Sequence, residues 1–272
     1  MKLSHAVIAA IATVLAATAI TGCRYIDYHP YDVDVSGPTD INGVNAKLIE
    51  EQCRGRDTIR FIATGDTQGC YDDTRDFVRS VNKRDSIDFV VHDGDLTDYG
   101  TMNEFKLQRN LLNKLRCPYV VTIGNHDCLG TGKQSFQKIF GATDFAFIAG
   151  RTKFVMLNTN SLEYDYSVAV PDFDFISKQD TARAGEFSQT IVTMHAHPFS
   201  DVFNNNVANT FEFLITRLPG ILFCINGHDH TMLQKAYFDD GLLYYQTSSI
   251  GHRTYYVFTV TPQGYTYEIV DF

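Results

Sequence analysis

The sequence is short of positive charge and has no tryptophan. Its 272 residues include 23 Lys and Arg against 32 Asp and Glu, which gives a formal net charge of −9. Proteins that bind long nucleic acids usually present a basic face, so this class is disfavoured. An acidic protein that handles phosphate groups needs metal ions to supply positive charge locally. The absence of tryptophan excludes nothing.

Paired cysteines, internal repeats and low-complexity segments are also missing. Without a Cys-x-x-Cys pair, a structural zinc site is not expected. The chain has six cysteines, and the five beyond Cys23 are an odd number whose pairing the spacing does not determine. Cys224 lies within the apolar run 221–225, so we expect it to be a buried free thiol.

Residues 1–22 are predicted to be a targeting segment that is no part of the fold. Lys2 supplies a short positive region, and the apolar stretch Ala6–Ile20 is shorter than a membrane span of about 20 residues. The stretch ends at Ile20-Thr21-Gly22-Cys23, which resembles the lipobox of bacterial lipoprotein signal peptides. The resemblance implies cleavage before Cys23, lipidation of its thiol, and export to the cell envelope as a membrane-anchored protein. The alternative is an ordinary secretory peptide with a cysteine nearby.

Residues 23–57 are expected to form a tether and a short helix over 45–53, and residues 58–272 to form one domain. In that domain strands alternate with helices, which predicts a parallel-type sheet with helical crossovers. Thr101 and Glu104 form a predicted capping box at one helix start. After residue 231 the pattern predicts antiparallel strands. The expected strands are 58–64, 87–92, 118–123, 145–149, 153–158, 189–194 and 221–226, and the expected helices are 72–83, 101–115, 134–140, 176–184 and 211–218.

Five of the predicted strands end in polar side chains. These are Asp66 and Gln68, Asp95 and Asp98, Asn125 and His126, His195, and finally His228 and His230. Ligands bind at the carboxyl ends of strands in open α/β sheets, so we expect these groups to share one crevice. Imidazoles and carboxylates together suit metals such as Zn, Mn or Fe. Two such ions about 4 Å apart hold an oxygen substrate and generate hydroxide near neutral pH.

The same residues resemble a known family. Gly65-Asp66-x-Gln68, Gly94-Asp95-x-x-Asp98, Gly124-Asn125-His126-Asp127, His195 and Gly227-His228-x-His230 occur in the order found in calcineurin-like metallophosphoesterases. The resemblance covers about residues 58–272. It implies an α/β fold of four layers, an αββα sandwich of mixed sheets with helices on the outer faces.

The resemblance also implies roles for these side chains. The first metal site would consist of Asp66, Gln68, Asp95 and His230. The second would consist of Asp95, Asn125, His195 and His228. Asp95 would bridge two divalent or trivalent ions (Mn, Fe or Zn, with Mg possible). Hydroxide held between the ions would attack a phosphate ester, and His126, oriented by the Asp98 carboxylate, would protonate the leaving group.

One position departs from the common pattern of the family, which has Asp-x-His in the first motif. Gln68 stands in place of that histidine. An amide oxygen is a poorer donor than imidazole, so we expect weaker metal binding at the first site and a preference for a harder ion such as Mn or Mg. Two alternatives stay open: a phosphodiesterase or nucleotide hydrolase of the same fold, and a weakly active lipoprotein that captures a phosphorylated ligand. No protein partner is evident.

Neighbouring polar residues are expected to have supporting roles. His92 is predicted to be packed in the core, and Asp127 and Asp229 to hold loops or ligand imidazoles in place. His197 either contacts substrate or supports the structure. His252-Arg253 is predicted to be a solvated turn, with phosphate contact as the alternative.

Overall fold

The computed structural model describes residue 7, residue 29, residues 31–165 and residues 167–272. Apart from residue 7, the predicted targeting segment and its lipidation site, Cys23, therefore lie outside the described residues. One compact unit spans Val33–Phe272. Within the described ranges, no helix has both the length and the apolar character needed to cross a bilayer.

Two mixed sheets form the centre of the Val33–Phe272 unit. The first contains β1 (Ile59–Thr64), β2 (Phe89–His92), β3 (Tyr119–Val121), β10 (Thr254–Thr261) and β11 (Gly264–Asp271). The second contains β4 (Phe145–Ala149), β5 (Thr152–Met156), β6 (Gln189–Thr193), β7 (Ile221–Asn226), β8 (Leu233–Lys235) and β9 (Tyr244–Gln246). Their strand orders are β11-β10-β1-β2-β3 and β4-β5-β6-β7-β9-β8.

The strands that carry the polar clusters run parallel to one another within each sheet, as the alternation predicts, while β1 also pairs antiparallel with β10 on its other side. β1, β2 and β3 pair in parallel, and so do β5, β6 and β7. The prediction of antiparallel strands after residue 231 is correct for β8 with β9 and for β10 with β11. It is wrong for β9 with β7, which pair in parallel. The reason is that β8 takes the sheet edge, so the chain reverses before β9 returns beside β7.

Helices cover the outer faces of both sheets. They are α3 (Tyr71–Val81), α4 (Met102–Leu112), α5 (Gly132–Phe140), α6 (Phe173–Gln179) and α7 (Ala208–Ile215), while α2 (Ile41–Cys53) lies at the sheet edges. The capping box at the start of α4 is confirmed, because Thr101 and Glu104 each accept the other's backbone N–H. α6 ends five residues before the expected 184. Buried Lys153 donates to the carbonyls of Gln179 and Ala182 there, and satisfies the end of the helix.

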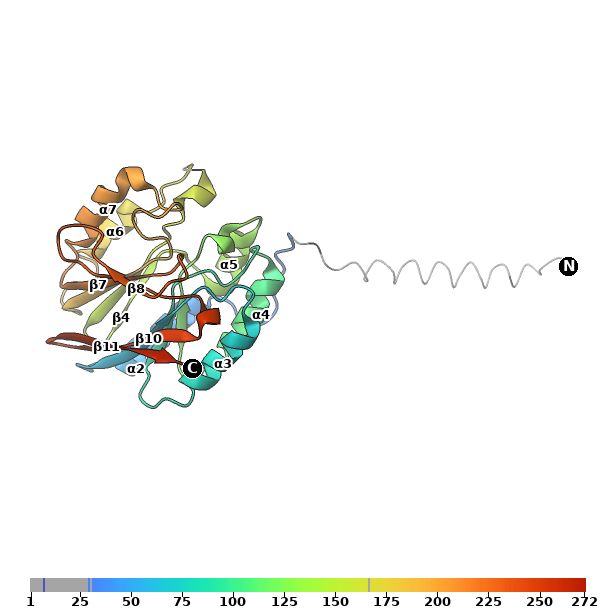
Figure 1. The fold of residues 1–272 in the computed structure, drawn as a ribbon, viewed down its shortest axis with the longest axis horizontal. Coiled ribbons are helices and arrows are strands. Elements are labelled where there is room, and N and C mark those ends of the chain that lie inside the picture. Colours follow the sequence, from blue (N-terminus) through green and yellow to red (C-terminus); the bar gives the residue numbers. More distant parts are fainter. Residues whose placement is uncertain (1–6, 8–28, 30, 166) are drawn as a thin grey trace. The chain divides into compact units, whose positions relative to one another are not determined.

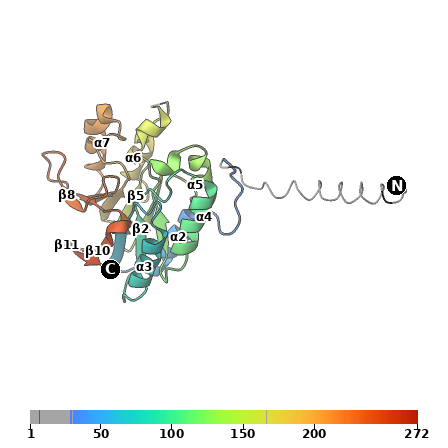
Figure 2. The same cartoon turned by 45° about the vertical axis from the view of Figure 1, so that its right-hand side comes forward.

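Three apolar clusters show that the unit has four layers. α3, α4 and α5 pack on the first sheet, and α6 and α7 pack on the second. The third cluster lies between the sheets, where the ring of Phe61 meets that of Phe154 edge-on at 5.1 Å. Figures 1 and 2 show α6 and α7 on one flank and α3 and α4 on the other. The predicted αββα sandwich is therefore confirmed.

Helix α2 covers one edge of each sheet, where it hydrogen-bonds to the edge strands β3 and β4. Asn42 makes two hydrogen bonds to Val121 of β3, from Nδ2 to the carbonyl (2.9 Å) and from the Val121 N–H to Oδ1 (2.8 Å). The N–H of Ile148 in β4 donates to Glu50 at 2.9 Å. Ile49 and Cys53 are buried in the cluster between the sheets. The helix is thus part of the compact unit, although the sequence pattern placed it in the segment before the domain.

Candidate metal centre

The predicted ligands of the second metal site converge on one point. Asn125 Oδ1 lies 3.1 Å from His195 Nε2 and 3.1 Å from His228 Nδ1. His195 Nε2 is also 3.4 Å from Asp95 Oδ2. These atoms come from the ends of β2, β3, β6 and β7, so both sheets contribute to the site.

In each of these two histidine rings, the nitrogen that faces away from Asn125 donates its proton to an oxygen. The nitrogen that faces Asn125 is then left as an acceptor. His195 Nδ1–H donates to the carbonyl of Asp93 at 3.0 Å. His228 Nε2–H donates to the carboxylate of Asp201 at 2.8 Å. With those protons committed, His195 Nε2 and His228 Nδ1 direct lone pairs toward Asn125 Oδ1. Acceptors that converge in this way fit a bound metal cation, or a proton in its absence.

The predicted ligands of the first site are also neighbours. His230 Nε2 lies 3.2 Å from Asp66 Oδ1 and 3.3 Å from Gln68 Nε2. The ligand atoms of Asp66, Asp95 and His230 all lie within 4.8 Å of one another. Asp95 Oδ2 belongs to both groups, since it is 3.2 Å from Gln68 Nε2 and also faces His195. Asp95 Oδ1 accepts the N–H of His126 at 3.0 Å, which fixes the carboxylate.

Gln68 differs from the other predicted ligands because its amide nitrogen, which cannot bind a metal ion, faces the site. Its Nε2 faces Asp95 and His230, while its Oε1 is buried without a hydrogen-bond partner in the described part of the chain. Metal ligation by the oxygen requires that the two ends of the amide exchange places. That exchange would give the oxygen, which has no partner in the present orientation, the cation as its partner.

The electrostatics of the centre also favour a cation. The carboxylates of Asp66, Asp93, Asp95 and Asp127 are all buried. Within the described residues, none of them pairs with Lys or Arg. Burial and then the nearby Asp95 raise the pKa of Asp127 to about 7. Burial lowers the pKa of His195, but the Asp95 carboxylate outweighs it and raises this pKa to about 10. Buried carboxylates without a Lys or Arg partner attract protons, and a metal ion supplies the same charge.

Four of the predicted ligands have a backbone conformation that L-residues seldom adopt. The φ angles are 48° at Asp66, 57° at Asp95, 81° at His228 and 54° at His230. Such left-handed residues cost about 1–3 kcal/mol each and cluster at functional sites. The glycines before the ligands allow close approach. A Cβ on Gly94, at φ 116°, would lie 2.7 Å from His195 Nδ1, and one on Gly124 would lie 2.1 Å from Asp95 Oδ1.

The ring of His126 is oriented by a backbone carbonyl and not by the Asp98 carboxylate that the resemblance implies. His126 Nδ1–H donates to the main-chain oxygen of Asp98 at 2.9 Å. Glu104 accepts the N–H groups of Asp98, Tyr99 and Thr101, which turns the Asp98 carbonyl toward the ring. The Asp98 carboxylate lies near Gly69 instead, and burial followed by Glu104 raises its pKa.

Most of the supporting residues have the expected structural roles. His92 is fully buried, and burial followed by His195 lowers its pKa to about 3. Asp127 accepts the N–H groups of Leu96, Thr97 and Gly124, which confirms that it holds these loops.

The alternatives for the flanking residues are also decided by their contacts. Asp229 Oδ2 lies 2.9 Å from His197 Nε2, so His197 supports a loop. Arg253 pairs with Asp73 and Asp76, which commits its guanidinium away from a phosphate role.

Two residues of the centre were not predicted. Asp93 is buried, and its Oδ1 has no hydrogen-bond partner among the described residues. Its ligand atom lies within 4.8 Å of those of Asp66 and His195. The signal was its place between His92 and Gly94 at the end of a strand. Asp201 is the other, and no local pattern identifies it, because it comes from a loop 27 positions from His228.

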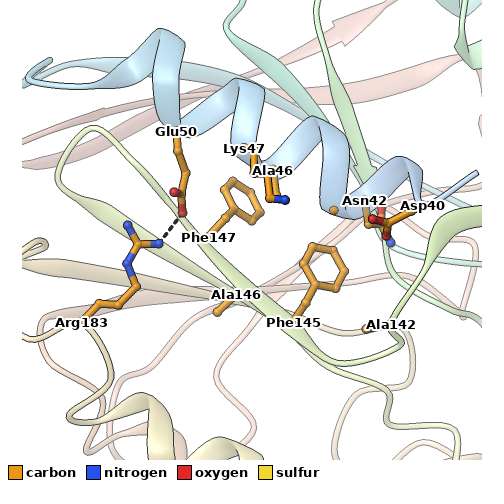
Figure 3. A pocket seen from close by; sticks show the side chains of 11 residues that line it. Asp40, Asn42, Ala46, Lys47, Glu50, Ala142, Phe145, Ala146, Phe147 and Arg183 are labelled. Carbon is orange, nitrogen blue, oxygen red and sulfur yellow. Dashed lines mark hydrogen bonds and ion pairs between the residues drawn. The ribbon is translucent and has the colours of Figure 1, made fainter.

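A cavity of about 310 Å³ lies elsewhere, between α2 and β4. Figure 3 shows Phe145 and Phe147 of β4 below the helix, with Arg183 paired to Glu50 at one end. None of the predicted metal ligands lines this cavity. It is therefore separate from the metal centre.

The fold and the strand-end site are those of one family. The sequence pattern of the calcineurin-like phosphoesterases matches residues 59–232, which is more than half of the chain. The protein therefore belongs to the calcineurin-like phosphoesterase family. Among curated proteins, none matches the chain in sequence.

Solved structures with the same fold include three phosphate-ester hydrolases by title. A dimetal phosphatase from Danio rerio has 14% identity and a TM-score of 0.61, over 78% of this chain and 98% of that one. The purple acid phosphatase PPD1 from yellow lupin has 13% identity and a TM-score of 0.57, over 80% and 55%. A 5'-nucleotidase from Candida albicans has 17% identity and a TM-score of 0.54, over 79% and 51%. At these identities the likeness concerns the fold.

Proposed function

We propose that the protein is a two-metal phosphoesterase that is anchored through Cys23 in the cell envelope. The observation that carries the proposal is the convergence of two sets of ligands on one oxygen, Asp95 Oδ2. The first ion would be held by Asp66, Gln68, Asp95 and His230. The second would be held by Asp95, Asn125, His195 and His228. When bound, the ions supply Lewis-acid polarisation of the phosphate oxygens and activation of water.

His126 is the proposed general acid. The hydrogen bond from its Nδ1–H to the Asp98 carbonyl fixes the ring and leaves Nε2 without a hydrogen-bond partner in the described part of the chain. Its backbone N–H binds Asp95, so the acid and the bridging carboxylate are held by one contact. A departing alkoxide needs a proton, and a fixed imidazole supplies it by general acid catalysis.

The acidity of the centre makes the metal a requirement for substrate binding. A phosphate ester is an anion, and the buried carboxylates would repel it in the metal-free protein. We therefore expect neither turnover nor tight phosphate binding after chelation, and recovery of both when Mn²⁺, Zn²⁺ or Fe is added back.

The test combines metal analysis with a substrate panel. The purified chain is analysed for bound metal and then assayed with p-nitrophenyl phosphate and its bis ester. The proposal expects two ions per chain and metal-dependent turnover of at least one ester. The absence of bound metal together with the absence of turnover would refute it. Turnover of the bis ester alone would identify a phosphodiesterase, and phosphate binding without turnover would favour the weakly active binding protein.

The proposed anchoring has its own test. In cells that process lipoproteins, the protein with Cys23 is expected in the membrane fraction. A Cys23→Ser variant is expected in the soluble fraction after export, because it lacks the thiol that receives the lipid. A mature wild-type chain whose mass shows no lipid on Cys23 would contradict the lipid anchor while leaving the phosphoesterase proposal intact.

A further inference from the structure

Two loops beside the second metal site are joined by reciprocal histidine–aspartate contacts. The first loop is His197–Asp201, after β6, and the second is Gly227–His230, after β7. His197 Nε2 lies 2.9 Å from the Asp229 carboxylate, and His228 Nε2 lies 2.8 Å from the Asp201 carboxylate. Each loop therefore contributes one imidazole and one carboxylate to the other.

The position of Asp201 is fixed, although its side chain is 83% exposed. The next two residues, Val202 and Phe203, are buried in the cluster below α7. On the other side, Phe199 has a φ of 72° and donates its N–H to Asn205 at 2.7 Å. A left-handed phenylalanine is uncommon and persists only where the surroundings determine it. The loop thus holds the Asp201 carboxylate at His228 without burying it.

We propose that Asp201 is a positioning residue of the second metal site. By accepting the proton of His228 Nε2, it keeps Nδ1 unprotonated and directed at Asn125 Oδ1, which lies 3.1 Å away. The inference rests on the proposed two-metal function. A second ligand, His195, is held in the same way by the carbonyl of Asp93, which no substitution removes. Asp201 is therefore the orienting group of this site that mutation can isolate.

Removal of such a partner typically weakens metal affinity about 10–100-fold. We expect Asp201→Ala to weaken the second metal by this factor and to leave the first unchanged. Asp201→Asn keeps an oxygen that accepts the Nε2 proton, so it should retain most of the affinity. Asp239→Ala, in an exposed turn, is the control for the loss of one surface carboxylate and should bind like the wild type.

The affinities of the two metal sites are measured by calorimetric titration of the metal-free full chain with Mn²⁺. Melting of the metal-free variants is measured in parallel, since an exposed substitution should change stability by less than about 0.5 kcal/mol. Nitrogen NMR of the histidine rings reads the His228 tautomer directly, and Asp201→Ala should lose the pure Nε2–H form.

The outcomes separate this inference from the proposed function. If the wild-type chain does not bind two ions, the proposed function fails and removes the basis for the inference. If it binds two ions and Asp201→Ala binds the second within twofold of the wild type, the positioning role alone is overturned. Equal weakening of both ions with a lower melting temperature of the metal-free variant would also overturn it, because that result reports a damaged fold.

Discussion

Replacement of the bridging carboxylate by its isosteric amide, Asp95→Asn, tests the centre of the proposed site most directly. Asp95 Oδ2 faces both ligand sets, whereas Oδ1 accepts the N–H of His126 at 3.0 Å. An asparagine keeps an acceptor for that N–H, while Asp95→Ala would leave it unpaired at a cost of about 1–3 kcal/mol. The amide removes the negative charge that both ions would share in the proposed site. We therefore expect neither ion to bind tightly.

The size of the effect follows from linkage. An ion present at a hundredfold excess over its Kd stabilises the folded chain by about 2.7 kcal/mol, so two ions contribute about 5.4 kcal/mol. In a unit of this size, 1 kcal/mol corresponds to about 2–4 °C in melting temperature. The wild-type protein should therefore melt roughly 10–20 °C higher with saturating metal than after chelation, and Asp95→Asn should show almost none of this shift.

The assay is thermal unfolding of both proteins, with and without metal, together with metal analysis. The difference between the two conditions cancels any effect of the substitution on the metal-free fold, such as the loss of the carboxylate beside His195. A variant that keeps the full metal-induced shift would refute the assignment of Asp95 as the shared ligand. An intermediate shift of about half would indicate that the amide still holds one ion.

Three further predictions concern catalysis and stability. His126→Ala should lower kcat by about 10²–10⁴-fold while metal analysis still finds two ions, because in the proposed mechanism the ring would donate a proton and bind no metal; loss of metal would contradict this role. Burial raises the pKa of Glu212, which bonds to the Tyr244 hydroxyl, to about 8. The native state then holds a proton that the unfolded chain releases, so stability should fall as the pH rises from about 4.5 to 8. Glu212→Gln should abolish this fall and be more stable than the wild type at pH 9, by on the order of 2 kcal/mol in denaturant titrations; equal pH profiles would count against it. Asn42→Ala should destabilise the fold by about 2–4 kcal/mol, since both backbone groups of Val121 lose their partner; a change below 1 kcal/mol in the same titration would show that water replaces the amide.

The parts of the site that the sequence could predict are those in which chemistry and chain position coincide. Asp66, Asn125 and His195 each follow an apolar run, and parallel strands bring such positions to one edge of the sheets. The order of the polar clusters then identified the family. The apolar runs also predicted the layered architecture, because a strand that is apolar throughout, such as β1, must be covered on both faces of its sheet.

The remaining parts depend on contacts that no local pattern encodes. The carbonyl of Asp98 meets His126 because Glu104 folds the intervening turn, and a sequence pattern does not reveal the direction of a carbonyl. Asp201 reaches His228 from a loop whose path is set by buried Val202. Similarly, β9 runs parallel to β7 because a short edge strand precedes it.

The way in which α2 closes the sheets bears on any attempt to produce a smaller version of the protein. The family match begins at residue 59, after the helix has ended at Cys53. A chain begun at residue 59 and kept to Phe272 would lose Asn42 and Glu50, and it would leave the backbone groups of β3 and β4 open at one edge of each sheet. Open edges of this kind recruit strands from other molecules. Such a fragment should self-associate and precipitate, whereas a chain that begins before Val33 should stay monodisperse.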